Sequence, residues 1–168
     1  MIHMNQYCVV VANGTKARFF TLEDVEFPEI QSGPNLIKKK DLTNQELELH
    51  KEGLWTESKS GGNRAHGGQS HGYDDHRSQH GDEAEKRFAH TIADECKRFS
   101  LSNNTRKVVL VSQQRMLGHL RSALNNGMQG VHTRELAKDL SKMNAQDIQL
   151  HLARENLIPE RRAPGFNS

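Results

Sequence analysis

The tripeptide Gly67-Gly68-Gln69 is the part of the chain whose residue types most directly suggest chemistry. Two glycines let the backbone adopt positive φ and approach another molecule closely, because neither residue carries a Cβ. The glutamine adds a backbone N–H and a side-chain amide that donates and accepts hydrogen bonds. These groups can hold water or an oxyanion against an ester, with the Gln69 N–H as the stabilising donor. The opposing interpretation is that a glycine-rich loop produces this tripeptide by chance.

Histidines and aspartates lie close to the tripeptide in sequence and raise the question of a metal site. Imidazole and carboxylate groups suit transition metals. The spacing of these residues matches no closed zinc site, however, and no cysteine joins them. We therefore expect no bound metal and interpret the segment as a solvated loop, with only weak candidate ligands in His66, His71, His76 and His80.

Basic residues form a second group that could bind a partner, in this case the phosphates of RNA. Such contacts would weaken as salt concentration rises. An ordinary solvated charged face is the simpler interpretation of each run alone, unless the runs converge near the loop. The residues that we expect at such an interface are Lys38, Lys39, Lys40, Arg64, Lys86, Arg87, Lys97 and Arg98.

The composition predicts one domain without a strong overall charge. The chain has 168 residues, enough to bury a core, and a net charge of +2 from 23 basic and 21 acidic residues. Nucleic-acid binding would therefore need a local basic patch. Cys8 and Cys96 fall within apolar patterns, which favours buried free thiols and a reducing compartment. No secretion signal and no apolar run of membrane-spanning length is apparent, so we expect a cytoplasmic protein that does not bind membranes.

The elements that must position these residues begin with strands. Residues 6–12 form a β-branched run typical of a strand buried on both faces. The dipeptide Asn13-Gly14 then predicts a hairpin turn into a second strand at 16–22. A third strand is expected between Glu29 and Leu42. Further strands are predicted at Val108 to Val111 and at Val131 to Leu136.

A change in composition separates the two halves of the chain. Seven of the thirteen glycines and four of the ten histidines lie between Gly53 and Asp82, and after Trp55 no large aliphatic residue occurs there. Such a segment buries too little apolar surface to offset its ordering entropy, so it is predicted to be a mobile loop over 53–82. Asp82 with Glu85 then resembles the start of a helix.

Apolar spacing predicts three helices after this loop. Phe88, Ile92, Cys96 and Phe99 would form the buried face of the first helix. Ser112 and Asn144 are expected to cap the second and third helices. Because strands and helices alternate after an opening hairpin, the fold class is α/β, with a mixed sheet, parallel crossovers and flanking helices. We expect a single domain over 1–158 and a flexible tail over 159–168.

The order of several short motifs resembles the bacterial host attachment family, whose members are named as required for attachment to host cells. The resemblance covers about residues 5–152 and rests on Val9-Val10-Val11-Ala12-Asn13, Lys16-Ala17-Arg18-Phe19-Phe20, Lys40-Asp41-Leu42-Thr43, Glu85-Lys86-Arg87-Phe88-Ala89 and Val108-Val109-Leu110-Val111. That family is in turn similar to the middle domain of archaeal and eukaryotic class I translation release factors, in which a mixed sheet with flanking helices presents a Gly-Gly-Gln loop.

The release-factor resemblance implies a catalytic role for Gly67, Gly68 and Gln69, with Ser70 continuing the signature. Two departures limit it: the segment from His71 to Gly81 separates the signature from the expected helix, and the chain has no length for a codon-reading domain. What the resemblance implies is therefore codon-independent hydrolysis of peptidyl-tRNA in ribosome rescue, without a cofactor, with the ribosome or tRNA as partner. No nucleotide cofactor is expected, because neither a P-loop nor a Gly-x-Gly-x-x-Gly fingerprint occurs.

A second hypothesis comes from a different functional class. In it, the chain is a non-catalytic binding protein of the host attachment family. It would occupy the ribosome under stress or affect attachment to host cells indirectly. The sequence does not identify a protein partner.

Overall fold

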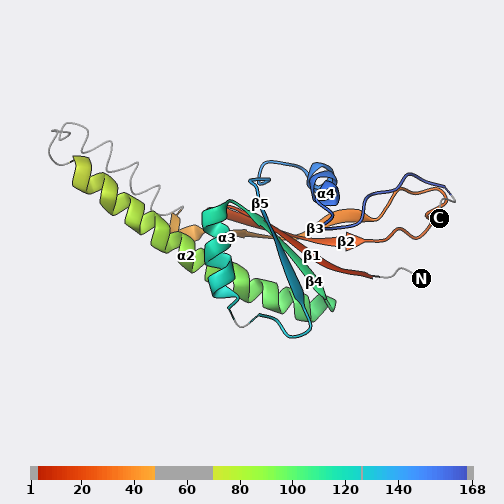
Figure 1. The fold of residues 1–168 in the computed structure, drawn as a ribbon, viewed down its shortest axis with the longest axis horizontal. Coiled ribbons are helices and arrows are strands. Elements are labelled where there is room, and N and C mark those ends of the chain that lie inside the picture. The colour runs from red at the N-terminus through yellow and green to blue at the C-terminus, as the bar shows by residue number, and fades with distance from the viewer. Residues whose placement is uncertain (1–3, 48–69, 126, 166–168) are drawn as a thin grey trace.

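Five strands form one mixed sheet in the order β3-β2-β1-β4-β5 (Figure 1). The computed structural model describes residues 4–47, 70–125 and 127–165. Within them, β2 pairs antiparallel with both β1 and β3, whereas β4 runs parallel to β1 and to β5. The strands are β1 (Met4–Ala12), β2 (Lys16–Glu23), β3 (Asn35–Thr43), β4 (Lys107–Ser112) and β5 (His132–Ala137).

Helices cover both faces of this sheet. Helix α2 (Ser70–Asn103) and helix α3 (Gln114–Ala123) contribute to the apolar core on one face, and α4 (Ala145–Arg154) contributes to the core on the other. The chain is thus a single mixed α/β domain, and the predicted order of strands and helices is confirmed.

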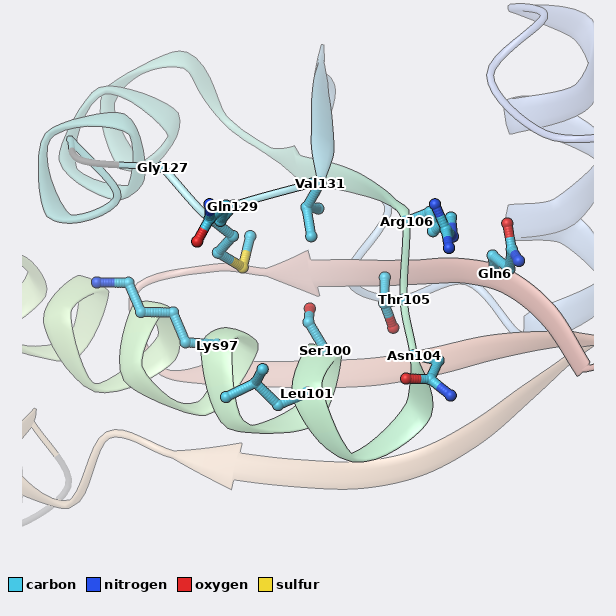
Figure 2. A pocket seen from close by; sticks show the side chains of 12 residues that line it. Gln6, Lys97, Ser100, Leu101, Asn104, Thr105, Arg106, Gly127, Gln129 and Val131 are labelled. Atoms are coloured by element: carbon cyan, nitrogen blue, oxygen red, sulfur yellow. The ribbon is translucent and has the colours of Figure 1, made fainter.

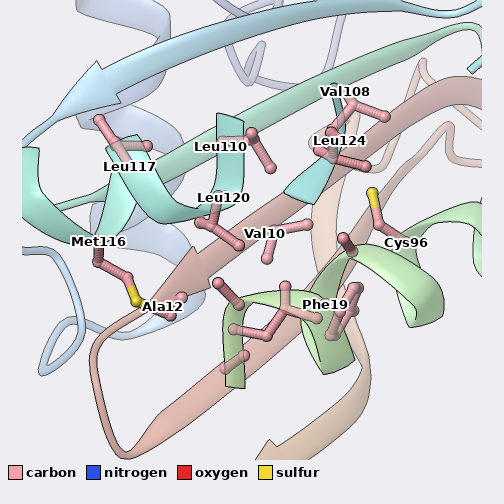
Figure 3. Close-up of a cluster of buried hydrophobic side chains, with 14 of the residues drawn as sticks. Val10, Ala12, Phe19, Cys96, Val108, Leu110, Met116, Leu117, Leu120 and Leu124 are labelled. Carbon is pink, nitrogen blue, oxygen red and sulfur yellow. The ribbon is translucent and has the colours of Figure 1, made fainter. Parts of the chain in front are cut away.

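Strand β1 lies at the centre and divides the core into two layers. Cys8, Val10 and Ala12 face α2 and α3 (Figure 3), while Val9 and Val11 belong to the layer under α4. Side chains alternate between faces along a strand, so a run of apolar residues is needed when both faces are covered. The prediction of a strand buried on both faces is therefore confirmed for residues 8–12.

Helix α2 begins earlier than the sequence predicted. Its first residue is Ser70, so residues 70–82, which we expected at the end of the loop, are helical. Asp82 and Glu85 lie inside the helix instead of starting it. Low apolar content removes the periodic signal by which a helix is recognised, but it does not prevent a helical backbone. The helix therefore begins immediately after Gln69 in sequence, and the expected non-helical segment from His71 to Gly81 is not present.

Local hydrogen bonds agree with the predicted β1–β2 turn and correct one of the two predicted caps. In the β1–β2 turn, the side chain of Asn13 accepts hydrogen bonds from the backbone N–H groups of Thr15 and Lys16, both at 2.8 Å. Ser112 does not cap α3: its hydroxyl donates to the Ala12 carbonyl at 2.7 Å, and Gln113 is the N-cap residue. The predicted cap of α4 is confirmed, because the Asn144 side chain accepts from the N–H of Asp147 at 2.8 Å.

The end of the chain contacts the segment that leads into β3. Gly33 and Arg162 exchange two backbone hydrogen bonds of 3.1 and 2.9 Å. The Arg161 guanidinium donates to the Asn35 side chain at 2.7 Å. Part of the segment that we predicted as a flexible tail is thus held against the start of an edge strand.

Candidate functional site

The residues predicted to be catalytic lie outside the described part of the chain. These are Gly67, Gly68 and Gln69, and the same holds for Arg64 and His66. His71, His76 and His80 belong to the backbone of α2, but their side chains are not among those described. The catalytic role of the tripeptide and the absence of a metal at these histidines therefore stay predictions.

The lysine run lies on β3, at one edge of the sheet. The pairing of β2 with β3 shifts between Phe19 and Phe20, so that Lys39 occupies a β-bulge. Each lysine has a carboxylate partner: Lys38 pairs with Asp41 at 2.8 Å, and Lys39 pairs with Glu23 at 2.7 Å. Lys40 reaches Glu95 on α2 at 2.8 Å. Charged side chains and bulges also protect an edge strand from pairing with other chains, which gives this run a structural role.

The predicted basic residues of α2 are largely paired as well. Lys86 lies 3.7 Å from Asp82, Arg98 lies 3.2 Å from Glu95, and Arg87 binds Glu46 through two guanidinium nitrogens. Six of the eight predicted RNA-binding residues thus have an acidic partner, and a seventh, Arg64, lies outside the described residues. Only Lys97 has no carboxylate partner in the part of the chain that the structure describes. Most of these residues are therefore paired with carboxylates in the described part of the chain, and RNA binding by them stays a prediction.

Four charged or titratable side chains meet where β1 and β4 end and α3 begins, and we call them the Asp82 cluster: Asp82, Glu85, Arg115 and His119. The Arg115 guanidinium donates twice to one Asp82 oxygen, at 2.8 and 3.0 Å. His119 Nε2 lies 3.1 Å from the same oxygen, and Arg115 Nε lies 3.7 Å from Glu85. The hydrogen bonds from Arg115 hold the pKa of Asp82 below its usual range, against a smaller effect of burial.

The Asp82 cluster has the residue types of a metal site but not its electrostatics. One ligand atom each of Asp82, Glu85 and His119 lies within 4.8 Å of the others. Arg115, however, already supplies a positive charge to both carboxylates. A metal ion would have to compete with this guanidinium for the same carboxylates, so the geometry favours a link between α2 and α3.

The cluster is also tied to the β1–β2 turn. The Glu85 side chain packs on Gly14, where an added Cβ would lie 2.4 Å from a carboxylate oxygen. The amide of Asn44 donates to the Gly14 carbonyl at 3.0 Å and to the Ala84 carbonyl at 3.3 Å. These contacts join the carboxyl end of β1 to the middle of α2.

A cavity of about 670 Å³ lies at the opposite end of the parallel strands, and we call it the amino-end pocket (Figure 2). Its walls come from the start of β1, the last turns of α2, the segment before β4 and the segment before β5. The lining residues are Gln6, Lys97, Ser100, Leu101, Asn104, Thr105, Arg106, Gly127, Met128, Gln129, Gly130 and Val131.

Backbone conformation fixes the walls of this pocket. Asn104 adopts a φ of 52° at the end of α2, and the N–H of Thr105 donates to the Ser100 carbonyl at 2.9 Å. This arrangement is a Schellman motif, which ends the helix and turns the chain towards β4. Gly127 and Gly130 have φ values of 63° and 75°, in the left-handed region that glycine adopts without strain.

The charge of the amino-end pocket is positive and unbalanced. Lys97 and Arg106 line it, and its lining contains no carboxylate. Figure 2 places their side chains at the two ends of the pocket, with Ser100 and Thr105 between them. The Ser100 side chain is buried, and its hydroxyl has no hydrogen-bond partner among the described residues.

Two buried cysteines lie between α2 and β1, one helical turn from Ser100. Cys8 and Cys96 are both free, as the apolar pattern predicted. The neighbouring Cys96 thiol raises the pKa of Cys8, and burial adds to this effect. The same contact lowers the pKa of Cys96, with a smaller contribution from the nearby Ser100 hydroxyl. Ser100 is thus close to a sulfur atom, but the two do not meet hydrogen-bond geometry.

Sequence reasoning identified only one residue of this pocket, Lys97, and none of the contacts in the Asp82 cluster. Asn104, Gly127 and Gly130 are turn-forming residue types, and this is the signal that could have indicated a turn at each position. Nothing in their spacing indicated that the turns face each other across the ends of three strands.

Comparison with known proteins identifies a family. The family model described as "Protein required for attachment to host cells" matches residues 8–152. The chain belongs to this family. No curated protein matches the chain. Among the described residues, no helix combines the length and apolar character that crossing a membrane requires.

Proposed function

From its membership of this family, we propose that the domain is a non-catalytic binding protein that engages a macromolecular partner through the projecting part of α2. The observation that carries the proposal is the shape of this helix. It is 34 residues long, and the first of its described side chains to join the core is that of Ala84. Before that residue the helix extends beyond the sheet (Figure 1). At 1.5 Å per residue, the projection is about 20 Å.

A projecting helix of this kind fits a role in binding. Helices in proteins gain most of their stability from packing an apolar face against other elements. Among the residues that the structure describes, Figure 1 shows no sheet or other helix alongside α2 ahead of Ala84. A partner surface would supply the missing contacts. The partner that we propose is the ribosome in the cytoplasm, and an effect on attachment to host cells would then be indirect.

A second function, hydrolysis of peptidyl-tRNA, is favoured by the point at which α2 begins. Ser70 is the first residue of the helix and follows Gly67-Gly68-Gln69 directly in sequence. In this function the tripeptide would act on the ester inside the partner's site, next in sequence to a helix that projects from the domain. One preorganised oxyanion donor contributes about 3–4 kcal/mol to catalysis, so its loss is measurable.

Co-sedimentation with ribosomes tests the binding proposal. We expect the wild-type protein to pellet with ribosomes at low salt and to be released as salt rises. A helix-breaking Ser78→Pro variant should lose association, because proline removes a backbone donor and clashes with the preceding turn. The Ser78→Ala variant is the matched control and should still associate. Failure of the wild type to associate at any salt concentration would contradict the proposal.

Stalled ribosomes carrying labelled peptidyl-tRNA separate the two functions. Release of peptide by the wild type, lost in Gly68→Ala and Gln69→Ala variants that still bind, would establish the catalytic function. Binding without release would leave the non-catalytic function. Attachment is measured separately, with cells that lack the gene and are complemented by each variant. Restored attachment by the Ser78→Pro variant would show that the projecting helix is not required.

A further inference from the structure

We infer that the amino-end pocket is a binding site for a small phosphorylated ligand. This inference is independent of the proposed function, because it concerns the end of α2 that packs on the sheet and not the projecting end. It rests on two unpaired cations, on an unpartnered buried hydroxyl and on the size of the cavity.

The positive charges of the pocket favour a negatively charged ligand. Lys97 and Arg106 have no ion-pair partner in the part of the chain that the structure describes, whereas most other predicted basic residues have one. A phosphate group accepts hydrogen bonds from both side-chain types, and the arginine fork can bind two of its oxygens. Because the lining contains no carboxylate, no negative side chain in the pocket repels a bound anion.

The position of the two cations suits a ligand longer than one phosphate group. Figure 2 places the Lys97 ammonium and the Arg106 guanidinium at opposite ends of the pocket. The amide side chains of Gln129 and Asn104 also line the pocket, and both can donate and accept hydrogen bonds. A ligand with phosphoryl groups at each end, or with a phosphoryl group and a polar body, would match both cations and the amides.

Ser100 supplies an independent observation that points to a ligand. Its side chain is only 5% exposed, and its hydroxyl has no hydrogen-bond partner among the described residues. Buried polar groups without a partner are uncommon, because each loses its hydration without compensation. In Figure 2 the hydroxyl points from α2 towards the wall formed by Val131 and Gln129. A ligand seated against that wall would complete the missing hydrogen bond.

The size and surroundings of the pocket favour a small molecule over RNA. A cavity of about 670 Å³ lies in the range of small-molecule sites. An RNA chain would need a continuous positive surface leading away from the pocket. The lysines of β3 and most basic residues of α2 are neutralised by carboxylates instead.

Titration with pyrophosphate and ribose 5-phosphate, followed by amide chemical shifts and calorimetry, tests this inference on the full chain. We expect saturable shifts confined to the pocket, that is to Gln6 and residues 97–106 and 127–131. Lys97→Gln and Arg106→Gln should each weaken the affinity about tenfold, since each removes a charge-assisted hydrogen bond. Ser100→Ala should weaken it about threefold without lowering stability, because the hydroxyl has no partner in the free protein. Lys142→Gln, which removes an exposed lysine outside the pocket, is the charge-matched control and should bind like the wild type.

Three results would overturn the inference. The first is the absence of binding by either probe at millimolar concentration in low salt. The second is an equal loss of affinity in the Lys142→Gln control, which would indicate only non-specific attraction. The third is a twelve-nucleotide RNA that displaces pyrophosphate and binds more tightly through the same residues, which would assign the pocket to RNA.

Discussion

The two ends of the packed part of α2 hold similar side chains in different electrostatic states. At the carboxyl ends of β1 and β4, the arginine of the Asp82 cluster contacts two carboxylates. At the amino ends of β1, β4 and β5, Lys97 and Arg106 line a cavity without any carboxylate. One end thus joins elements of the fold to each other, whereas the other keeps its positive charge for a ligand.

This difference shows that pairing, more than the number of basic residues, separates a structural site from a binding site. In open α/β sheets, ligands usually bind outside the carboxyl ends of the strands. Here that end is occupied by ion pairs and by the β1–β2 turn. The cavity with unpaired cations lies at the opposite end. Its walls there are the Schellman motif at Asn104 and the segment that contains Gly127 and Gly130.

The largest predicted effect on stability comes from the packed part of α2 that lies between the Asp82 cluster and the amino-end pocket. Ile92 is fully buried in the layer under α2. The Ile92→Ala variant should lose about 2–5 kcal/mol of unfolding free energy, because it removes buried methyl groups and leaves a cavity. Urea denaturation measures the loss. Thr91→Ala, at an exposed neighbouring position, is the control, and an equal loss there would contradict this account.

A smaller effect is expected where a paired cation serves the fold. Glu95 is buried, with a side chain 9% exposed, and it is shared between Lys40 and Arg98. Lys40→Gln should lower the unfolding free energy by about 1 kcal/mol, since Glu95 keeps only one cationic partner. Urea denaturation at low and high salt checks this. The Lys142→Gln variant should show no change, and a more stable Lys40→Gln variant would show that the pair has no structural role.

The Asp82 cluster predicts a dependence of stability on pH. The folded-state pKa of Asp82 is lowered, so its stabilising contribution is present above the usual aspartate range and is lost as pH falls through the lowered pKa. Arg115→Gln should remove the main cause of this shift. Its cost at neutral pH should be about 0.5–1 kcal/mol, as for other exposed pairs.

Urea denaturation between pH 6 and pH 2 measures this pH effect. The stability difference between wild type and Arg115→Gln should shrink as Asp82 is protonated in the wild type. A difference that stays constant over this range would show that Arg115 acts without Asp82.

The smallest effect on stability is expected at the other end of the comparison. Lys97→Gln combined with Arg106→Gln should change the unfolding free energy by less than about 0.5 kcal/mol, because neither side chain has an ion-pair partner among the described residues. The same double variant should lose binding of pyrophosphate. A stability loss as large as that of Lys40→Gln would mean that both ends of α2 are structural.

The core could be predicted from the sequence because its signals are local. The alternation in residues 8–12 and the spacing of Phe88, Ile92, Cys96 and Phe99 report burial directly. The beginning of α2 could not be predicted in this way, since residues 70–82 lack the apolar pattern that marks a packed helix. Asp82 and Glu85 have the spacing of a helix start, but their carboxylates bind Arg115 on another helix.

The sequence by itself determined the α/β class, the order of the elements and the family, because each depends on short-range patterns in chain order. Only the tertiary structure decided which charges are neutralised and which line a cavity. Lys40 meets Glu95 across 55 positions, and Lys97, Arg106 and Gly130 line one cavity only because three strands begin at the same end of the sheet. Charge pairing depends on the distances between side chains in space, and the order of residue types along the chain does not specify those distances.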